Sequence, residues 1–290
     1  PNYKCFGYYG GMPKLNLKNP EVEKFITDVA CYWIKECNID GWRMDVGDEI
    51  SHYFWKNFRR AVKAVKKDIL IIGEIWHYAG DFLEGDEWDT VMNYPFYLNM
   101  IDLLADEKIH VSQFVQNLGY LKGRLNKKCY PLMWNLIDSH DTARFLHLCN
   151  DNKKKQHLAA AFQLLLPGMP MIYYGDEYAM PGANDPDCRR GMYWDEEYQD
   201  KEMYEWYKRL IQVRKSHACI VEGELAGIVT EDEEGTVVLI RKNGEETIAM
   251  IFNCSSSAKK FNEYTQKYNL LTENTFDGNV EGFDAAVIVL

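Results

Sequence analysis

Two spacings of apolar residues alternate along the first three quarters of the chain. Five segments carry apolar residues at helical spacing, at residues 20–38, 51–67, 111–125, 153–166 and 202–215. Five short apolar runs ending in polar residues lie among them, at residues 39–46, 69–72, 90–93, 132–137 and 169–174. Strands that alternate with helices in this way form a parallel sheet covered by helices, so we predict an α/β fold.

The first helix has a well-marked start. Asn19 suits the N-cap, Pro20 suits the first helical position, and Glu21 favours the positive end of the helix. The apolar residues of this helix fall on one face and are Val22, Phe25, Ile26, Val29 and Trp33.

The pattern changes near residue 217. Two apolar segments, residues 236–241 and 246–252, flank an Asn243-Gly244 pair, which is a strong signal for a hairpin turn. Residues 285–290 form another apolar strand. We therefore predict that residues 218–290 form a small antiparallel domain.

The balance of charge excludes several classes of partner. The chain has 33 Lys and Arg against 44 Asp and Glu, a formal charge of −11. An acidic chain is not expected to bind nucleic acid or an anionic membrane surface. The longest apolar runs are also far shorter than a membrane span, so we expect no membrane partner.

The cysteines suggest a reducing compartment. Eight are scattered along the chain, with no CxxC pair and no set of four at zinc spacing. A disulfide scaffold is not expected at this length, so we predict free thiols that serve as small buried apolar residues. These features favour a cytoplasmic protein that requires no cofactor or metal, and this segment gives no support for a structural calcium.

Three of the apolar runs lead into carboxylates. Asp45 follows IDGWRM, Glu74 follows ILIIG, and Asp141 follows LMWNLIDSH. The carboxyl ends of parallel strands meet at one mouth of a sheet or barrel. One Asp or Glu after a strand is often only a helix cap, but three together favour carboxylate chemistry. Glycoside hydrolysis needs such a set, because one carboxylate attacks and another protonates the leaving oxygen.

The residues around these acids resemble the alpha-amylase family, glycoside hydrolase family 13. Three runs are similar to signature regions of that family: GWRMDVGDE (41–49), GEIWH (73–77) and SHDTAR (139–144). MPKLNLKNPEV (12–22) resembles the end of its domain B. GDEWDTVMNYPF (85–96) and NDPDCRRGMYW (184–194) resemble its neopullulanase, cyclomaltodextrinase and maltogenic amylase branch.

The resemblance covers essentially the whole chain and implies an architecture. Residues 1–19 would be the end of domain B. Residues 20–217 would supply strands four to eight of a (β/α)8 TIM-barrel catalytic domain, and residues 218–290 a C-terminal antiparallel β-sandwich.

The resemblance also implies catalytic roles. Asp45 would be the nucleophile, Glu74 the general acid/base, and Asp141 the residue that binds hydroxyls of the sugar at the cleavage site. From the residues themselves, Arg43 lies two positions before Asp45 on the same strand face and is placed to keep Asp45 ionised.

Further residues match substrate-binding positions of the family. His140 resembles a glucose-binding histidine, and Trp76 resembles a platform on the leaving-group side. The branch usually has Ala-Asn before the residue that matches Glu49, whereas this chain has Gly47-Asp48. The pair on the non-leaving side would be Asp185 and Arg189.

Several parts of the family architecture have no counterpart in this sequence. Only five barrel strands are present, and the first three strands and the first signature region are missing. The chain thus resembles a C-terminal portion of a longer enzyme. Open sheet edges favour pairing, so we expect a homo-oligomer. The strands that would close the barrel and hold the acids in place are missing, so we expect no hydrolase activity from residues 1–290 alone.

Three functions fit these observations. The first is a retaining hydrolase of α-1,4-glucosidic bonds in maltodextrins, cyclodextrins, pullulan or starch, with an α-glucan oligosaccharide as its partner. An α-1,6-glucosidase of the same family is the second, although MPKLN and NDPDCRR favour the first. A non-catalytic amylase-like sugar-binding or scaffold module is the third, but such modules usually lose one of the acids, and all three are kept here.

Overall fold

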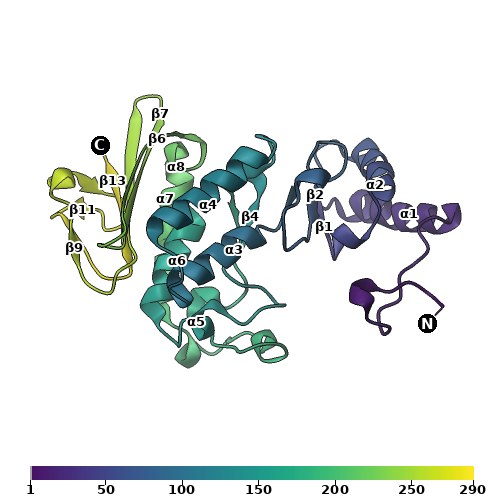
Figure 1. Ribbon diagram of the computed structural model, residues 1–290, viewed down its shortest axis with the longest axis horizontal. Helices are drawn as coiled ribbons and strands as arrows, with labels where there is room; N and C mark the ends of the chain where they lie inside the picture. The colour runs from purple at the N-terminus through teal and green to yellow at the C-terminus, as the bar shows by residue number, and fades with distance from the viewer. Residues whose placement is uncertain (1) are drawn as a thin grey trace. The chain divides into compact units, whose positions relative to one another are not determined.

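The computed structural model describes residues 2–290, so residue 1 of the predicted domain B segment lies outside the described residues. The chain divides into two units, which we describe separately. The first holds residues 2–93 and 124–134, and the second holds residues 94–123 and 135–290. Figure 1 labels the elements of both.

The first unit is built on a parallel sheet. Its strands are hydrogen-bonded in the order β1-β2-β3, and both neighbouring pairs are parallel, as predicted. Met92 forms a further parallel bridge with Trp134. The helices and strands of this unit are α1 (Pro20–Cys37), β1 (Gly41–Met44), α2 (His52–Val65), β2 (Leu70–Gly73) and β3 (Thr90–Val91).

Helix α1 begins where the sequence predicts. The Asn19 side chain accepts a hydrogen bond from the Glu21 amide, and Pro20 is the first helical residue. Its apolar face is less buried than the face of a core helix, because Phe25 is 62% exposed and Trp33 is 45% exposed. This helix therefore presents an apolar surface that the described residues leave uncovered.

The second unit begins with helices around one apolar core. The core joins buried residues of α6 and α7 to the C-terminal strands. Between the predicted elements lies a continuous helical segment that the sequence analysis missed, α3 followed by a π-helical turn at Ile101–Ala105. The elements are α3 (Tyr94–Met100), α4 (Val111–Arg124), β4 (Trp134–Asn135), α5 (Phe145–Leu148), α6 (Lys153–Leu165), β5 (Met169–Pro170), α7 (Lys201–Ser216) and α8 (Ala218–Glu222).

An antiparallel sheet ends the second unit, as predicted. Its order is β11-β10-β13-β8-β7-β6, and β9 pairs with β12 in a separate two-stranded sheet. The sheet lies beside the helices of its unit in Figure 1. The strands are β6 (Glu224–Glu231), β7 (Thr236–Asn243), β8 (Glu246–Asn253), β9 (Lys259–Lys260), β10 (Tyr268–Asn269), β11 (Asn274–Thr275), β12 (Asn279–Val280) and β13 (Asp284–Val289).

Both faces of this sheet are buried along β8. Phe252 of β8 stacks on Phe162 of α6 with ring centroids 4.1 Å apart. On the opposite face, Ile251 packs in a second core with Phe261 and Val280. The predicted turn joins β7 to β8, because Asn243 pairs with Glu246 and Gly244 has φ of 60°.

Other sequence expectations need correction. The strands predicted at residues 132–137 and 169–174 are only two residues long. A 3-10 turn at Tyr130–Leu132 takes up the start of the first, and regular pairing ends after Asn135 and after Pro170. All eight cysteines are free thiols, as predicted, but the prediction that they are buried holds for only four of them. Cys5, Cys31 and Cys254 are half-buried, and Cys37 is exposed at the end of α1. No helix within residues 2–290 is long and apolar enough to cross a membrane.

Candidate active site

The parallel register of the first unit places two acids side by side. Met44 of β1 pairs with Gly73 of β2, and the Glu74 amide donates to the Met44 carbonyl at 2.9 Å. Asp45 directly follows β1, and Glu74 directly follows β2. They therefore leave the carboxyl ends of neighbouring parallel strands at the same level, as expected for a site at a strand mouth.

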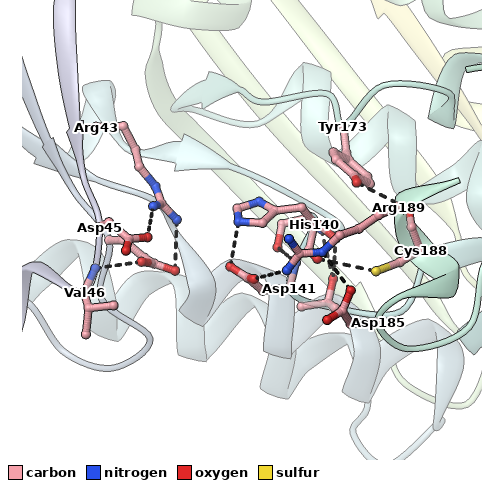
Figure 2. A network of polar contacts seen from close by, with 12 residues as sticks. Arg43, Asp45, Val46, His140, Asp141, Tyr173, Asp185, Cys188 and Arg189 are labelled. Carbon is pink, nitrogen blue, oxygen red and sulfur yellow. Dashed lines mark hydrogen bonds and ion pairs between the residues drawn. The ribbon is translucent and has the colours of Figure 1, made fainter. Parts of the chain in front are cut away.

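Arg43 contacts both acids. Its guanidinium forms an ion pair with Asp45 and another with Glu74, the latter at 3.0 Å. Figure 2 shows Arg43 pointing toward Asp45. The acids differ in environment, because the Asp45 side chain is 73% exposed and the Glu74 side chain only 6%. One carboxylate thus faces solvent and the other is enclosed.

Glu74 is held by further donors. The Val46 amide donates to one carboxylate oxygen at 2.8 Å, and the Trp76 indole donates to the other at 3.3 Å. Val46 has φ of 46°, a left-handed conformation that is a genuine outlier for a β-branched residue. Such strain costs on the order of 1–3 kcal/mol and clusters at functional sites. Here the unusual backbone accompanies an amide aimed at the enclosed acid.

The indole of Trp88 lies beneath both strand ends. Trp88 is fully buried and stacks on Phe82 with centroids 4.2 Å apart. A Cβ at Gly73 would lie 2.2 Å from this indole, and a Cβ at Gly47 would lie 2.6 Å from it. Glycine is therefore required at both positions, each within two residues of an acid. This contact gives a physical reason for Gly47 where the resembling branch usually has Ala.

Two other predicted site residues lie in this unit. The Trp76 side chain is 40% exposed. Glu49 pairs with Lys14 at 2.5 Å and accepts from the Gly7 amide at 2.8 Å. The hydrogen bond from Lys14 lowers the pKa of Glu49. Glu49 thus ties the N-terminal loop to the segment that follows Asp45.

A second group of predicted residues lies in the second unit. His140 Nε2 lies 3.0 Å from Asp141 Oδ2. The Arg189 guanidinium contacts Asp141 Oδ1 at 3.0 Å and Asp185 Oδ1 at 2.8 Å. Figure 2 shows these four side chains in one network. Each lies partly exposed, so their polar groups are available to hydroxyl groups of a ligand.

The loop around Cys188 supports this network. The Cys188 thiol donates to the His140 carbonyl at 3.4 Å, and Tyr173 donates to the Cys188 carbonyl at 3.3 Å (Figure 2). The Asp141 amide donates to the Ser139 hydroxyl at 3.2 Å. The two loops that carry His140 and Arg189 are therefore joined within one unit.

A buried contact between an arginine and an aspartate supports these loops. Arg144 is fully buried, donates to Asp176 at 3.1 Å, and its amide donates to the Gly182 carbonyl at 2.9 Å. The Asp138 carboxylate accepts from the Phe145 amide at 2.7 Å. Burial raises the pKa of Asp138, and burial together with the negative charge of Asp138 raises the pKa of Asp176 well above its usual range.

The chemistry of these groups is that of carboxylates and hydrogen-bond donors. Among the residues that the structure describes, no cluster of three or more His, Cys, Asp or Glu side chains could hold a metal ion.

The sequence-predicted residues fall into two groups. Those in the first unit are Arg43, Asp45, Glu49, Glu74 and Trp76, and those in the second are His140, Asp141, Asp185 and Arg189. Sequence reasoning missed their supports, which are Val46, Trp88, Gly47, Gly73, Arg144 and Asp176. Five of them lie within the quoted motif runs, and Asp176 lies shortly after the apolar run at residues 169–174, so these were the only local signals for them.

Comparison with known proteins identifies the family of this chain. The family model for the alpha-amylase catalytic domain matches residues 2–199. The chain is 45% identical over 258 residues to a cyclomaltodextrinase from Geobacillus thermopakistaniensis, covering 89% of this chain and 44% of that protein. It is 42% identical over 253 residues to an intracellular maltogenic amylase from Bacillus subtilis, covering 87% of this chain and 43% of the relative.

Solved structures give the same result. A cyclomaltodextrinase structure superposes with a TM-score of 0.93 at 34% identity, covering 99% of this chain and 52% of that one. A cyclic α-maltosyl-(1→6)-maltose hydrolase from Arthrobacter globiformis has a TM-score of 0.88 at 32% identity, covering 100% of this chain and 64% of that one. The chain spans about half the length of the curated relatives it matches. This chain belongs to the alpha-amylase catalytic-domain family.

Proposed function

We propose that this chain carries the catalytic acids of a retaining glycoside hydrolase that cleaves α-1,4-glucosidic bonds. The observation that carries the proposal is the pair Asp45 and Glu74, which leave neighbouring parallel strands in register and share Arg43. The family membership and the names of the relatives support it. Maltodextrins, cyclodextrins, pullulan and starch are the proposed substrates.

The two environments suit two different roles. Asp45 is exposed and paired with Arg43, so it is the group to attack the anomeric carbon as a carboxylate. As that bond forms, the bond to the glycosidic oxygen breaks, and Glu74 gives its proton to the leaving oxygen. Water then attacks the glycosyl–Asp45 ester while Glu74 takes a proton from it. Asp45 is released, and the anomeric configuration is retained.

The remaining residues are proposed to hold the sugar. Asp141 and His140 would bind hydroxyls at the cleavage site, with Arg189 and Asp185 on the non-leaving side. Their contacts with one another support a shared hydrogen-bonding surface. Trp76 offers an exposed ring for stacking, and Glu49 would act on the acceptor side. The presence of all three acids argues against a non-catalytic module.

We infer the wider architecture from the same resemblance. The strands β1 to β5 correspond to strands four to eight of a (β/α)8 barrel, residues 2–19 to the end of domain B, and residues 218–290 to a C-terminal β-sandwich. The exposed apolar face of α1 supports a partner that covers it, in a homo-oligomer. A cytoplasmic location is proposed from the name of the intracellular Bacillus subtilis relative.

Product analysis tests the proposed activity. The full-length product of the gene that carries this chain is incubated with cyclodextrin, starch and pullulan, and the sugars released are separated. We expect maltodextrin products from the parent protein, and a loss of about three or more orders of magnitude in kcat for Asp45→Asn and for Glu74→Gln.

Matched variants guard against misfolding. Asp48→Asn changes an acid of the same segment that has no proposed role, and should retain most of the rate. If Asp45→Asn or Glu74→Gln kept more than about a tenth of the parent rate, the assigned roles would be wrong.

A further inference from the structure

The second unit contains a hollow that none of the roles above uses. It lies along the segment that follows β5 and the loop after Arg190. We call it the aromatic groove. Its lining residues are Tyr174, Glu177, Tyr178, Met192, Trp194 and Gln199.

Trp194 is the most unusual residue of the aromatic groove. Its side chain is 81% exposed, although indole is among the largest apolar groups a protein can bury. Tyr174 contributes a second ring that is 38% exposed. Two partly open aromatic faces in a hollow are suited to a ligand that stacks on rings.

The groove is built on anchored residues. Tyr174 donates to the Arg190 carbonyl at 2.6 Å, and Tyr178 stacks on Tyr204 with ring centroids 5.1 Å apart and planes 5° apart. The Gln199 side chain donates to the Tyr193 carbonyl at 2.7 Å, which holds the backbone next to Trp194. These contacts hold the aromatic residues and their backbone in place, so the groove loses little conformational freedom when a ligand binds.

The polar groups of the groove favour a neutral, hydroxyl-rich ligand. Glu177 is its only Asp, Glu, Lys, Arg or His, and one oxygen of its carboxylate accepts from the Gly175 amide at 2.8 Å. A lone carboxylate disfavours phosphate and other anions. Together with the Tyr174 hydroxyl and the Gln199 amide, it can instead exchange hydrogen bonds with sugar hydroxyls. Aromatic faces with a few placed polar groups are the usual lining of small-ligand sites.

The groove and the proposed sugar site are linked by one loop of the second unit. The Arg190 carbonyl accepts a hydrogen bond from the Tyr174 hydroxyl. Arg190 directly follows Arg189, whose guanidinium contacts Asp141 at 3.0 Å.

We propose that the aromatic groove binds the outer glucose units of a long α-glucan, with Trp194 as its main stacking surface. The inference rests on the proposed function, since it extends the same ligand beyond the cleavage site.

Binding measurements with two chain lengths test this. The full-length protein with Glu74→Gln, which prevents cleavage, is titrated with maltotriose and with maltoheptaose by calorimetry. Trp194→Ala should weaken maltoheptaose binding about 3- to 10-fold, the effect of losing one aromatic contact, and change maltotriose binding less than about 2-fold. Trp194→Phe should restore most of the affinity, because it keeps a ring.

Controls separate this site from general effects. Tyr268→Ala removes an exposed aromatic residue of β10 outside the groove and should change neither affinity. Trp194→Gln provides a second replacement without an aromatic ring if the Ala variant unfolds. Equal weakening of both sugars, or no weakening of either, would overturn the inference. So would dissociation of an oligomer by Trp194→Ala, which would make the groove a contact between copies.

The two proposals fail in different ways. A parent protein that cleaves cyclodextrin, combined with an unchanged maltoheptaose affinity in Trp194→Ala, would refute the groove and leave the hydrolase intact. A parent protein that cleaves no α-glucan and binds no maltotriose would refute the proposed function and the groove with it.

Discussion

The strand ends of the first unit and the C-terminal sheet of the second differ in regularity. β7 and β8 are eight residues each and pair along their whole length, with most of their residues buried. β1 and β2 have four residues each, and β1 is followed at once by Val46 in a left-handed conformation. The regular sheet uses its residues for packing. The short strands end at the two acids proposed to be catalytic, and the residues around those ends pack against Trp88.

The largest expected effect concerns the completeness of the site. Within the described residues, β1 is paired on one side only, with β2. Effective catalysis needs carboxylates held within about half an ångström of productive geometry, and barrel closure fixes the tilt of the strands. We predict that the isolated 290-residue chain has no measurable hydrolase activity on cyclodextrin.

Light scattering and a sugar-release assay on the purified chain check this prediction. We also expect the chain to be oligomeric, with partners over its open edge. A monomer that cleaves cyclodextrin at an ordinary enzyme rate would show that the strand ends organise themselves without further support.

The second prediction tests the packing role of the C-terminal sheet. Phe252→Ala removes a fully buried ring that stacks on Phe162, and should lower the free energy of unfolding by about 3–5 kcal/mol. Leu225→Ala in β6 is the control. Because Leu225 is 46% exposed, its change should stay within about 0.5 kcal/mol. Urea unfolding followed by circular dichroism measures both. Equal effects would mean that the sheet does not depend on this contact.

The third prediction tests the contact beneath the acids. Gly47→Ala places a methyl group against the Trp88 indole and should lower the free energy of unfolding by about 1–3 kcal/mol, with a fall in kcat. Gly119→Ala is the matched control. Gly119 lies inside α4 with open space around it, so Ala should be neutral or stabilising by up to about 1 kcal/mol. An unchanged free energy of unfolding in Gly47→Ala would refute the packing role assigned to Trp88.

The fourth prediction concerns the buried acids behind the second group. The pKa of Asp176 is raised in the folded chain, mainly by burial, so the folded state keeps a proton that the unfolded state releases above a pH of about 4. The contribution of Asp176 to the free energy of unfolding is therefore present at low pH and declines as the pH rises toward the pKa of Asp176 in the folded state. Asp176→Asn, which mimics the protonated acid, should make stability depend less on pH above about 4.

Thermal unfolding between acidic and neutral pH measures this difference. Glu197→Gln alters an exposed acid of the same unit and serves as the control. An unchanged pH dependence in Asp176→Asn would show that the raised pKa has no part in stability.

Much of the first unit could be predicted from sequence, because its signals are local. The cap at Asn19 set the start of α1, and the apolar runs before Asp45 and Glu74 indicated their strands. The conformation of Val46 could not be predicted, since a β-branched residue disfavours a positive φ and only tertiary contacts impose it. The packing of Trp88 against Gly47 and Gly73 depends on segments 15 to 41 positions apart.

The second unit shows the same division. The hairpin at Asn243-Gly244 was predicted because the turn chemistry is local. β6 was missed because most of its residues are exposed and its pairing is interrupted between Leu225 and Gly227. The buried hydrogen bond between Arg144 and Asp176 could not be predicted, because burial of ionisable residues follows from the tertiary fold rather than from any local pattern.

The central claim is that Asp45 attacks the sugar while Glu74 supplies the proton. The most direct test is proton NMR of the first product released from cyclodextrin by the full-length enzyme, recorded before mutarotation. The account predicts that the α-anomer appears first, because two displacements at the anomeric carbon retain its configuration. A β-anomer appearing first would mean that water attacks directly, and would contradict the role of Asp45 as nucleophile.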